Sequence, residues 1–144
     1  MKTFIGSMDI TIEAALHLTH MVQAGDVIHF IGDLGSGKTT FIAALAAHLR
    51  CTQNVSSPTF TLVHEVPGPV LSICHVDAYR CVPSDTVGLG LDHYLMEDNY
   101  ILCIEWPNML GVWAPPATHI VTITEDEADR NNRIIVIERS KEYN

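Results

Sequence analysis

One segment of the chain has the residue types and the spacing of a phosphate-binding loop. Residues 32–39 read Gly-Asp-Leu-Gly-Ser-Gly-Lys-Thr and fit the pattern G-x-x-x-x-G-K-[ST]. Its three glycines permit the backbone angles at which successive N–H groups turn inward, so the loop can enclose a phosphate at a helix N-terminus. Lys38 would bring a positive charge to the β- and γ-phosphates, and the Thr39 hydroxyl could ligate Mg²⁺. The loop therefore predicts a nucleotide site.

Two carboxylates follow apolar runs and could complete this site. The run from Val70 to Val76 ends in Asp77, and the run from Ile101 to Ile104 ends in Glu105. Ligands of an open parallel sheet gather at the carboxyl ends of its strands, which is also the edge that carries the loop. One acid can hold Mg²⁺ or its water while the other holds the attacking water. Asp77 is favoured on the metal side, although the sequence does not assign the two roles, and acids also end strands as solvated turn residues.

Three further features have two interpretations each. Trp106 could stack on a base or a partner, or it could be a core or rim aromatic. Arg80 could contact phosphate or pair with an acid. The segment Ser56-Ser57-Pro58-Thr59 could rearrange on hydrolysis as a switch loop does, or it could be an ordinary turn.

The elements that must position these residues alternate between strands and helices. A stripe with Ile12 and Leu16 predicts a helix over residues 9–24, with Asp9 or Ser7 as its N-cap and Gly25 as its stop. A strand over 27–31, the loop and a helix through Leu49 come next. Further strands are predicted over residues 59–66, 70–77, 101–105, 119–124 and 133–138. Pro67-Gly68-Pro69 suggests a hairpin, and two short helical turns are predicted between residues 83 and 99, starting at Ser84 and Leu91.

This order predicts an α/β fold of the P-loop NTPase type, in three layers, with helices flanking a mixed sheet whose central strands are parallel. Hydrophobic residues make up 47% of the 144 residues and charged residues 17%. That composition excludes intrinsic disorder, and the length suggests a single domain over residues 1–144. The four cysteines lie in or beside apolar runs without a C-x-x-C pair, so we expect reduced core thiols.

The charge balance and the hydropathy pattern limit the molecules that the protein can bind and the compartment in which it can reside. A formal net charge of -9 disfavours direct, extensive contact with nucleic-acid phosphates. No apolar run approaches the roughly 20 residues of a membrane span, and the N-terminus lacks the features of a signal peptide. We therefore expect a cytoplasmic protein that does not contact the membrane.

Four sequence blocks together resemble the TsaE family, formerly called YjeE, whose members are P-loop ATPases of bacterial tRNA threonylcarbamoyladenosine biosynthesis. The blocks occur in the order and spacing of the family and cover nearly the whole chain. They are Gly-Asp-Leu-Gly-Ser-Gly-Lys-Thr-Thr-Phe (32–41), Ser-Pro-Thr-Phe-Thr-Leu-Val (57–63), His-Val-Asp-Ala-Tyr-Arg (75–80) and Glu-Trp-Pro (105–107).

The resemblance implies an ATPase that binds ATP or ADP with Mg²⁺ and acts with a TsaB-TsaD complex in modifying adenosine 37 of tRNA. ATP hydrolysis would drive turnover of that complex, and the protein would contact tRNA only through its partners. On this reading Thr39 and Glu105 belong to the Mg²⁺ site, and Asp77 is an essential carboxylate beside them. The adenine side maps onto Thr11, a C-terminal arginine onto Arg130 or Arg133, and a switch-like loop onto Ser57 to Thr61. The complete expected nucleotide site consists of Thr11, Gly32, Asp33, Gly35, Ser36, Gly37, Lys38, Thr39, Thr40, Trp106, Arg130 and Arg133, with Lys38, Asp77 and Glu105 as its catalytic residues.

The same loop also serves other classes of protein. A small nucleotide or metabolite kinase is the principal alternative, although kinases usually need further cationic clamps and a lid, and the chain has five arginines. A GTPase-like binding module is disfavoured because no Asn-Lys-x-Asp stretch is present. A protein that binds ADP without turnover is disfavoured by Asp77 and Glu105.

Overall fold

The computed structural model of the chain describes residues 1–53, 55, 62–81 and 90–141. The predicted start of the strand at 59–61, the segment at 56–59 and the helical turn at Ser84 lie outside these residues. Within the described residues the elements, in chain order, are β1 (Lys2–Gly6), α1 (Asp9–Thr19), β2 (Val27–Ile31), α2 (Lys38–His48), β3 (Val63–Val66), β4 (Ser72–Asp77), α3 (Leu91–Met96), β5 (Tyr100–Glu105), the 3-10 helix η2 (Pro107–Trp113), β6 (His119–Asp126) and β7 (Asp129–Arg139).

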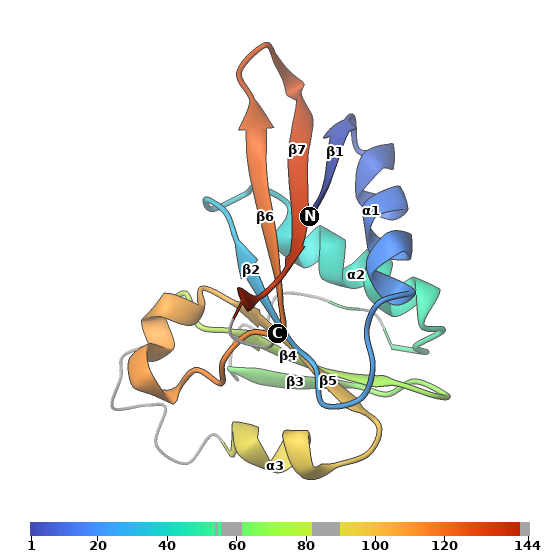
Figure 1. Cartoon of the computed structure of the whole chain (residues 1–144), viewed down its shortest axis with the longest axis vertical. Coiled ribbons are helices and arrows are strands. Elements are labelled where there is room, and N and C mark those ends of the chain that lie inside the picture. The colour runs from blue at the N-terminus through green and yellow to red at the C-terminus, as the bar shows by residue number, and fades with distance from the viewer. Residues whose placement is uncertain (54, 56–61, 82–89, 142–144) are drawn as a thin grey trace.

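The described strands form one twisted sheet in the order β1-β7-β6-β2-β5-β4-β3 (Figure 1). The four neighbours β6, β2, β5 and β4 run parallel, whereas β7, β1 and β3 are antiparallel to the strands beside them. The predicted α/β fold with a mixed sheet and a parallel centre is therefore confirmed. Buried on both faces, the central strands are almost continuously apolar, as parallel strands usually are.

Helices cover both faces of the sheet, which makes the three predicted layers. Along β5, Ile101 and Cys103 pack in one core with α1 and α2, while Leu102 and Ile104 pack in a second core with α3 and η2. This alternation follows from the two-residue period of a strand. Figure 1 shows α1 and α2 side by side, with α3 on the other side of the sheet.

The first helix differs from its prediction in length and in the face that it buries. It ends at Thr19 instead of residue 24, its N-cap is Met8, and no side chain caps it. Its buried residues are Thr11, Ala14, Ala15 and Leu18. Ile12 and Leu16, which the stripe placed on the inner face, are 54% and 44% exposed. The buried face is rich in alanine because α1 packs closely on α2, and small side chains suit that contact.

Two elements were not predicted from the sequence. β1 is an edge strand paired with β7, and only Phe4 among its residues is buried, so its hydrophobic pattern is weak. η2 follows Pro107 and buries Leu110 in the second core. The predicted hairpin at Pro67-Gly68-Pro69 is confirmed by the antiparallel pairing of β3 with β4.

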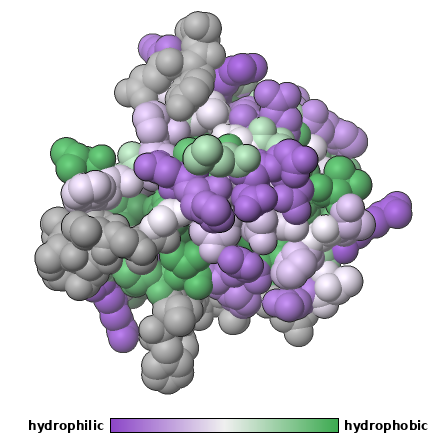
Figure 2. Space-filling view, turned by 90° about the horizontal axis from the view of Figure 1, so that it is seen from below, coloured by the Kyte–Doolittle hydropathy of each residue, from purple (hydrophilic) through white to green (hydrophobic). Residues whose placement is uncertain are grey.

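The surface on the α3 side is mainly hydrophilic in its middle, with apolar residues on either side (Figure 2). The four cysteines are free; Cys74, Cys81 and Cys103 are buried and Cys51 is partly buried, as expected. No helix among the described residues is long and apolar enough to cross a bilayer.

Candidate nucleotide-binding site

The glycine-rich loop connects β2 to α2, so the predicted strand, loop and helix are all present. Gly37 precedes α2 with a φ of 109°, a left-handed conformation that glycine adopts without strain. Lys38 and Thr39 are consequently the first two residues of the helix, where the helix dipole and the unpaired N–H groups favour an anion. The register pairs Phe30 of β2 with Glu105 of β5, so the loop emerges beside the end of β5.

Lys38 is folded back onto the loop that precedes it. Its Nζ donates to the carbonyl oxygens of Gly32 at 2.5 Å and Asp33 at 3.0 Å, and it lies 4.2 Å from the centre of the Trp106 ring. Burial lowers the pKa of Lys38, and the nearby carboxylates of Glu105, Asp77 and Asp33 oppose that shift. These contacts hold a cation at the N-terminus of α2, where the helix dipole favours an anion.

Thr39 and the two predicted carboxylates come together at the carboxyl edge of the sheet. The Thr39 hydroxyl donates to Glu105, at 2.9 Å from Oε2 and 3.2 Å from Oε1. Asp77 is in register with Glu105 on the neighbouring strand, and its Oδ1 accepts the backbone N–H of Tyr79. The structure thus joins Thr39 to Glu105 and places Asp77 beside Glu105 on the next strand, and the metal role predicted for Asp77 stays a prediction.

The loop packs closely on β6, and this contact depends on Gly32. A Cβ at Gly32 would lie 2.6 Å from the carbonyl oxygen of Ile123 and 2.5 Å from Ser36 Oγ. Ser36 is buried, and its hydroxyl has no hydrogen-bond partner in the described part of the chain. An unpaired buried hydroxyl is uncommon in folded proteins, so this one is available to a ligand of the loop.

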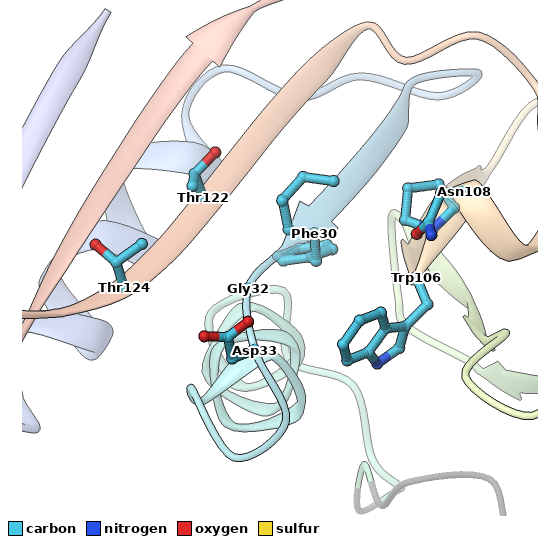
Figure 3. Close-up of a pocket in the computed structure, with 9 residues that line it drawn as sticks. Phe30, Gly32, Asp33, Trp106, Asn108, Thr122 and Thr124 are labelled. Atoms are coloured by element: carbon cyan, nitrogen blue, oxygen red, sulfur yellow. The ribbon is translucent and has the colours of Figure 1, made fainter.

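Trp106 forms one wall of a cavity of about 260 Å³ beside the loop. Its backbone has a φ of 57°, which is strained for a residue other than glycine, and its ring lies 5.0 Å from that of Tyr79. Figure 3 shows Thr122 and Thr124 of β6 across the cavity from Trp106 and Asn108, with Gly32 and Asp33 at the loop. Trp106 therefore lines the cavity and lies against the lysine of the loop, and its stacking on a base stays a prediction.

The two candidate arginines differ in their contact with the loop. Arg133 of β7 donates from Nε to the carbonyl oxygen of Ser36 at 3.3 Å. Arg130 is exposed and accepts a hydrogen bond from Arg133 at its backbone oxygen. The structure therefore brings Arg133 to the loop, and it does not bring Arg130 there.

The remaining predicted residues lie around the site or outside the described chain. Thr11 is buried in the first turn of α1, and the hydrogen bonds of the described residues do not join it to the loop. Asp33, Gly35 and Thr40 are exposed at the loop and at the start of α2. Arg80 is exposed in the turn after β4. The switch-like segment over residues 57–61 lies outside the described residues.

His75 was not predicted as a site residue, although it lies in one of the four sequence blocks. It is fully buried, and its Nε2 is 2.6 Å from Glu105 Oε2. A signal for it was present in the sequence, because a polar residue two positions before Asp77 points to the same face of the strand. The sequence did not show that this face carries Glu105.

The donor atoms at the edge of the sheet suit Mg²⁺. Mg²⁺ binds oxygen, and proteins commonly hold it with one or two carboxylates together with phosphates and waters. The Thr39 hydroxyl and the Glu105 carboxylate provide such oxygens beside the phosphate loop. Among the described residues no group of three or more His, Cys, Asp or Glu side chains could hold a metal ion alone, so a bound phosphate would have to contribute ligands.

Comparison with known proteins gives a consistent result. Residues 5–135 match the family model described as threonylcarbamoyl adenosine biosynthesis protein TsaE. The chain is 31% identical over 136 residues to a tRNA threonylcarbamoyladenosine biosynthesis protein TsaE of Nostoc sp., covering 92% of this chain and 84% of that protein. It is 42% identical over 93 residues to the protein of that name from Bacillus subtilis, covering 65% of this chain and 58% of that protein. The crystal structure of Bacillus subtilis YdiB superimposes with a TM-score of 0.71 at 29% identity, covering 99% of this chain and 89% of that one.

Proposed function

The chain belongs to the TsaE family of threonylcarbamoyl adenosine biosynthesis proteins, and from this membership we propose that it is a Mg²⁺-dependent ATPase that supports threonylcarbamoyladenosine formation in tRNA. ATP is preferred over GTP in this proposal because the sequence lacks a guanine-reading Asn-Lys-x-Asp stretch. The reaction is transfer of the γ-phosphoryl group to water.

The observation that carries the proposal is the arrangement at the start of α2. Lys38, the helix N-terminus and the Ser36 hydroxyl, which is unpaired among the described residues, would surround a bound phosphate chain. Next to it, the Thr39 hydroxyl and the Glu105 carboxylate present oxygens to one point. A cradle for phosphates beside hard oxygen donors is what nucleoside triphosphate hydrolysis requires.

Each residue has a separate part in the proposed reaction. Lys38 leaves the carbonyl oxygens of Gly32 and Asp33 and neutralises the β- and γ-phosphates. Thr39 and Glu105 hold Mg²⁺, which when bound stabilises negative charge on the phosphates. Asp77, in register with Glu105, orients the attacking water and accepts its proton. Arg133 supports the backbone of the loop at Ser36.

The partners follow from the family resemblance. We propose that the chain acts with a TsaB-TsaD complex and that hydrolysis drives turnover of that complex. The net charge of -9 supports contact with tRNA through those partners instead of directly. Hydrolysis by the isolated chain would then be slow, because partner binding can complete or position the site.

The test is phosphate release by the full chain, measured with ATP and with GTP, with Mg²⁺ and with EDTA, and with or without TsaB and TsaD proteins. We expect release from ATP only with Mg²⁺, faster with the partners present. In Lys38→Ala the dissociation constant for ATP should rise roughly tenfold to a hundredfold, the cost of a lost hydrogen bond to a charged group. Lys141→Ala removes the same charge from an exposed position after β7 and should leave the affinity unchanged.

Two outcomes would contradict the proposal. If neither ATP nor GTP is hydrolysed even with the partners present, the chain is a nucleotide-binding module instead of an ATPase. If phosphate from ATP appears on an added nucleoside or small metabolite and not in water, the chain is a kinase, and the proposed hydrolytic role is wrong.

A further inference from the structure

A buried histidine contacts the carboxylate that accepts the hydrogen bond of Thr39. Alternation along β4 places Ile73 and His75 on the face toward α2, while Cys74 and Val76 pack in the opposite core. β4 and β5 run parallel and in register, with His75 opposite Cys103 and Asp77 opposite Glu105. The His75 ring therefore lies on the same face as the Glu105 side chain.

The contact has the geometry of a strong hydrogen bond. Nε2 of His75 lies 2.6 Å from Oε2 of Glu105, and the two residues are 0% and 3% exposed. A carboxylate can only accept, so Nε2 carries the hydrogen and donates it. A hydrogen bond of this length between a buried imidazole and a buried carboxylate is stronger than one between two neutral groups.

Glu105 is held between two donors that approach from different elements. Thr39 at the start of α2 donates to Oε1 and Oε2, and His75 from β4 donates to Oε2. Two donors from separate elements restrict the position and the plane of the carboxylate more than either donor would alone. The orientation of Glu105 toward Thr39 thus depends on His75.

Stability of the fold does not explain a histidine at this position. Its other ring nitrogen, Nδ1, is buried and has no hydrogen-bond partner among the described residues. A buried polar atom without a partner opposes folding, and an apolar side chain of similar volume would avoid this cost. The gain from His75 must therefore come through Nε2 and Glu105.

We propose that His75 is a positioning residue that orients the Glu105 carboxylate for Mg²⁺ at the nucleotide site. This inference rests on the proposed function, because it assigns Glu105 to the metal. Residues that hydrogen-bond to a metal ligand fix its orientation, and their loss typically lowers metal affinity or activity about tenfold to a hundredfold.

The experiment compares the full chain with His75→Leu, which removes the donor, and His75→Gln, whose amide nitrogen can replace Nε2. Cys103→Ala is the matched control, since Cys103 is fully buried, lies opposite His75 in the sheet and forms no hydrogen bond with Glu105 among the described residues. Calorimetry measures ATP affinity with and without Mg²⁺, phosphate release gives kcat and KM, and thermal unfolding gives Tm.

We expect His75→Leu to lose the tightening of ATP affinity by Mg²⁺ and to lower kcat about tenfold to a hundredfold, with unchanged ATP affinity in EDTA. His75→Gln should recover most of both, and Cys103→Ala should behave as the parent in both. In a Glu105→Gln background, exchanging His75 for Gln or Leu should have no further effect, because His75 acts through Glu105.

The inference is overturned if His75→Leu keeps the parental Mg²⁺ effect and kcat, or if His75→Gln is impaired as much as His75→Leu. If His75→Leu does not fold, His75→Gln decides the matter alone: it must keep the parental Mg²⁺ effect, and a loss of that effect overturns the inference. Failure of the proposed function has a different signature, since the parent itself would then show neither hydrolysis nor an effect of Mg²⁺ on ATP affinity.

Discussion

At the scale of single residues, Lys38 is bound within its own loop, at the end of α2 that favours an anion. It bonds two carbonyl oxygens of its own loop and stacks on Trp106. Burial lowers its pKa, so the protonated form is less favoured here than in water. A phosphate group would favour the protonated form, so nucleotide binding and the charge of Lys38 reinforce each other.

The prediction for single residues concerns the role of Asp77 in ATP hydrolysis. Asp77→Asn keeps the size of the side chain and removes its negative charge. We expect kcat for ATP hydrolysis to fall about a hundredfold or more, the usual contribution of a general base, while ATP affinity changes little. Calorimetry and phosphate release measure the two effects separately.

The control for this variant is Asp92→Asn, which removes the same charge from the exposed first turn of α3 and should leave kcat unchanged. If Asp77→Asn keeps the parental kcat, Asp77 takes no part in the reaction. Glu105 would then be the remaining candidate carboxylate at this edge of the sheet.

At the scale of elements, the loop that leads into α2 packs against the strand β6. Gly32 comes so close to the backbone of β6 that a single added carbon would contact the carbonyl oxygen of Ile123 at 2.6 Å. Arg133 of β7 holds the other end of the loop at Ser36. The conformation of the phosphate cradle is therefore set by the β6–β7 pair as well as by its own glycines.

Gly32→Ala tests the contact between the loop and the backbone of β6. The backbone of β6 is hydrogen-bonded to β2 and β7 and cannot move aside cheaply, so the loop must shift. We expect a stability loss of about 1–3 kcal/mol, typical of overpacking, together with weaker ATP binding. Urea unfolding and calorimetry measure the two quantities.

Gly6→Ala is a milder comparison for this variant, since the nearest atom to the new Cβ is the Ile10 side chain at 3.2 Å. It should leave ATP affinity unchanged. Parental stability and parental affinity in Gly32→Ala would show that the loop does not depend on its contact with β6.

At the scale of the whole molecule, the parallel strands bring distant residues to one edge. β2, β4 and β5 are neighbours in the sheet, so Lys38, Asp77 and Glu105 meet although they span residues 38 to 105. At this edge Lys38 lies among the carboxylates of Glu105, Asp77 and Asp33, and the chain as a whole has a net charge of -9. The N-terminus of α2 and Lys38 favour a small anion at the loop, whereas the net charge repels an extended polyanion.

This charge distribution predicts that the isolated chain does not bind tRNA directly. At about 0.15 M salt we expect a dissociation constant above about 10⁻⁴ M, which means weaker binding than is usual for non-specific complexes. Anisotropy of a labelled tRNA measures it, and addition of TsaB and TsaD proteins should bring the tRNA into a complex. Tight binding by the isolated chain that falls steeply with salt would contradict the prediction.

The sequence by itself determined the parts of the protein whose signals are local. The loop was predictable because glycine spacing and the Lys-Thr pair act within eight residues, and its flanking strand and helix have strong hydrophobic patterns. The buried central strands were predictable for the same reason. Their acidic ends placed Asp77 and Glu105 at the correct edge of the sheet.

Only the tertiary structure decided which of these residues touch. It paired Thr39 with Glu105, brought Arg133 rather than Arg130 to the loop, and set His75 against Glu105. It also turned Ile12 and Leu16 outward, because the close approach of α1 to α2 favours the alanine face of the helix. Such contacts depend on strand order, register and helix rotation, which arise from packing between segments far apart in the chain and leave no local mark in the sequence.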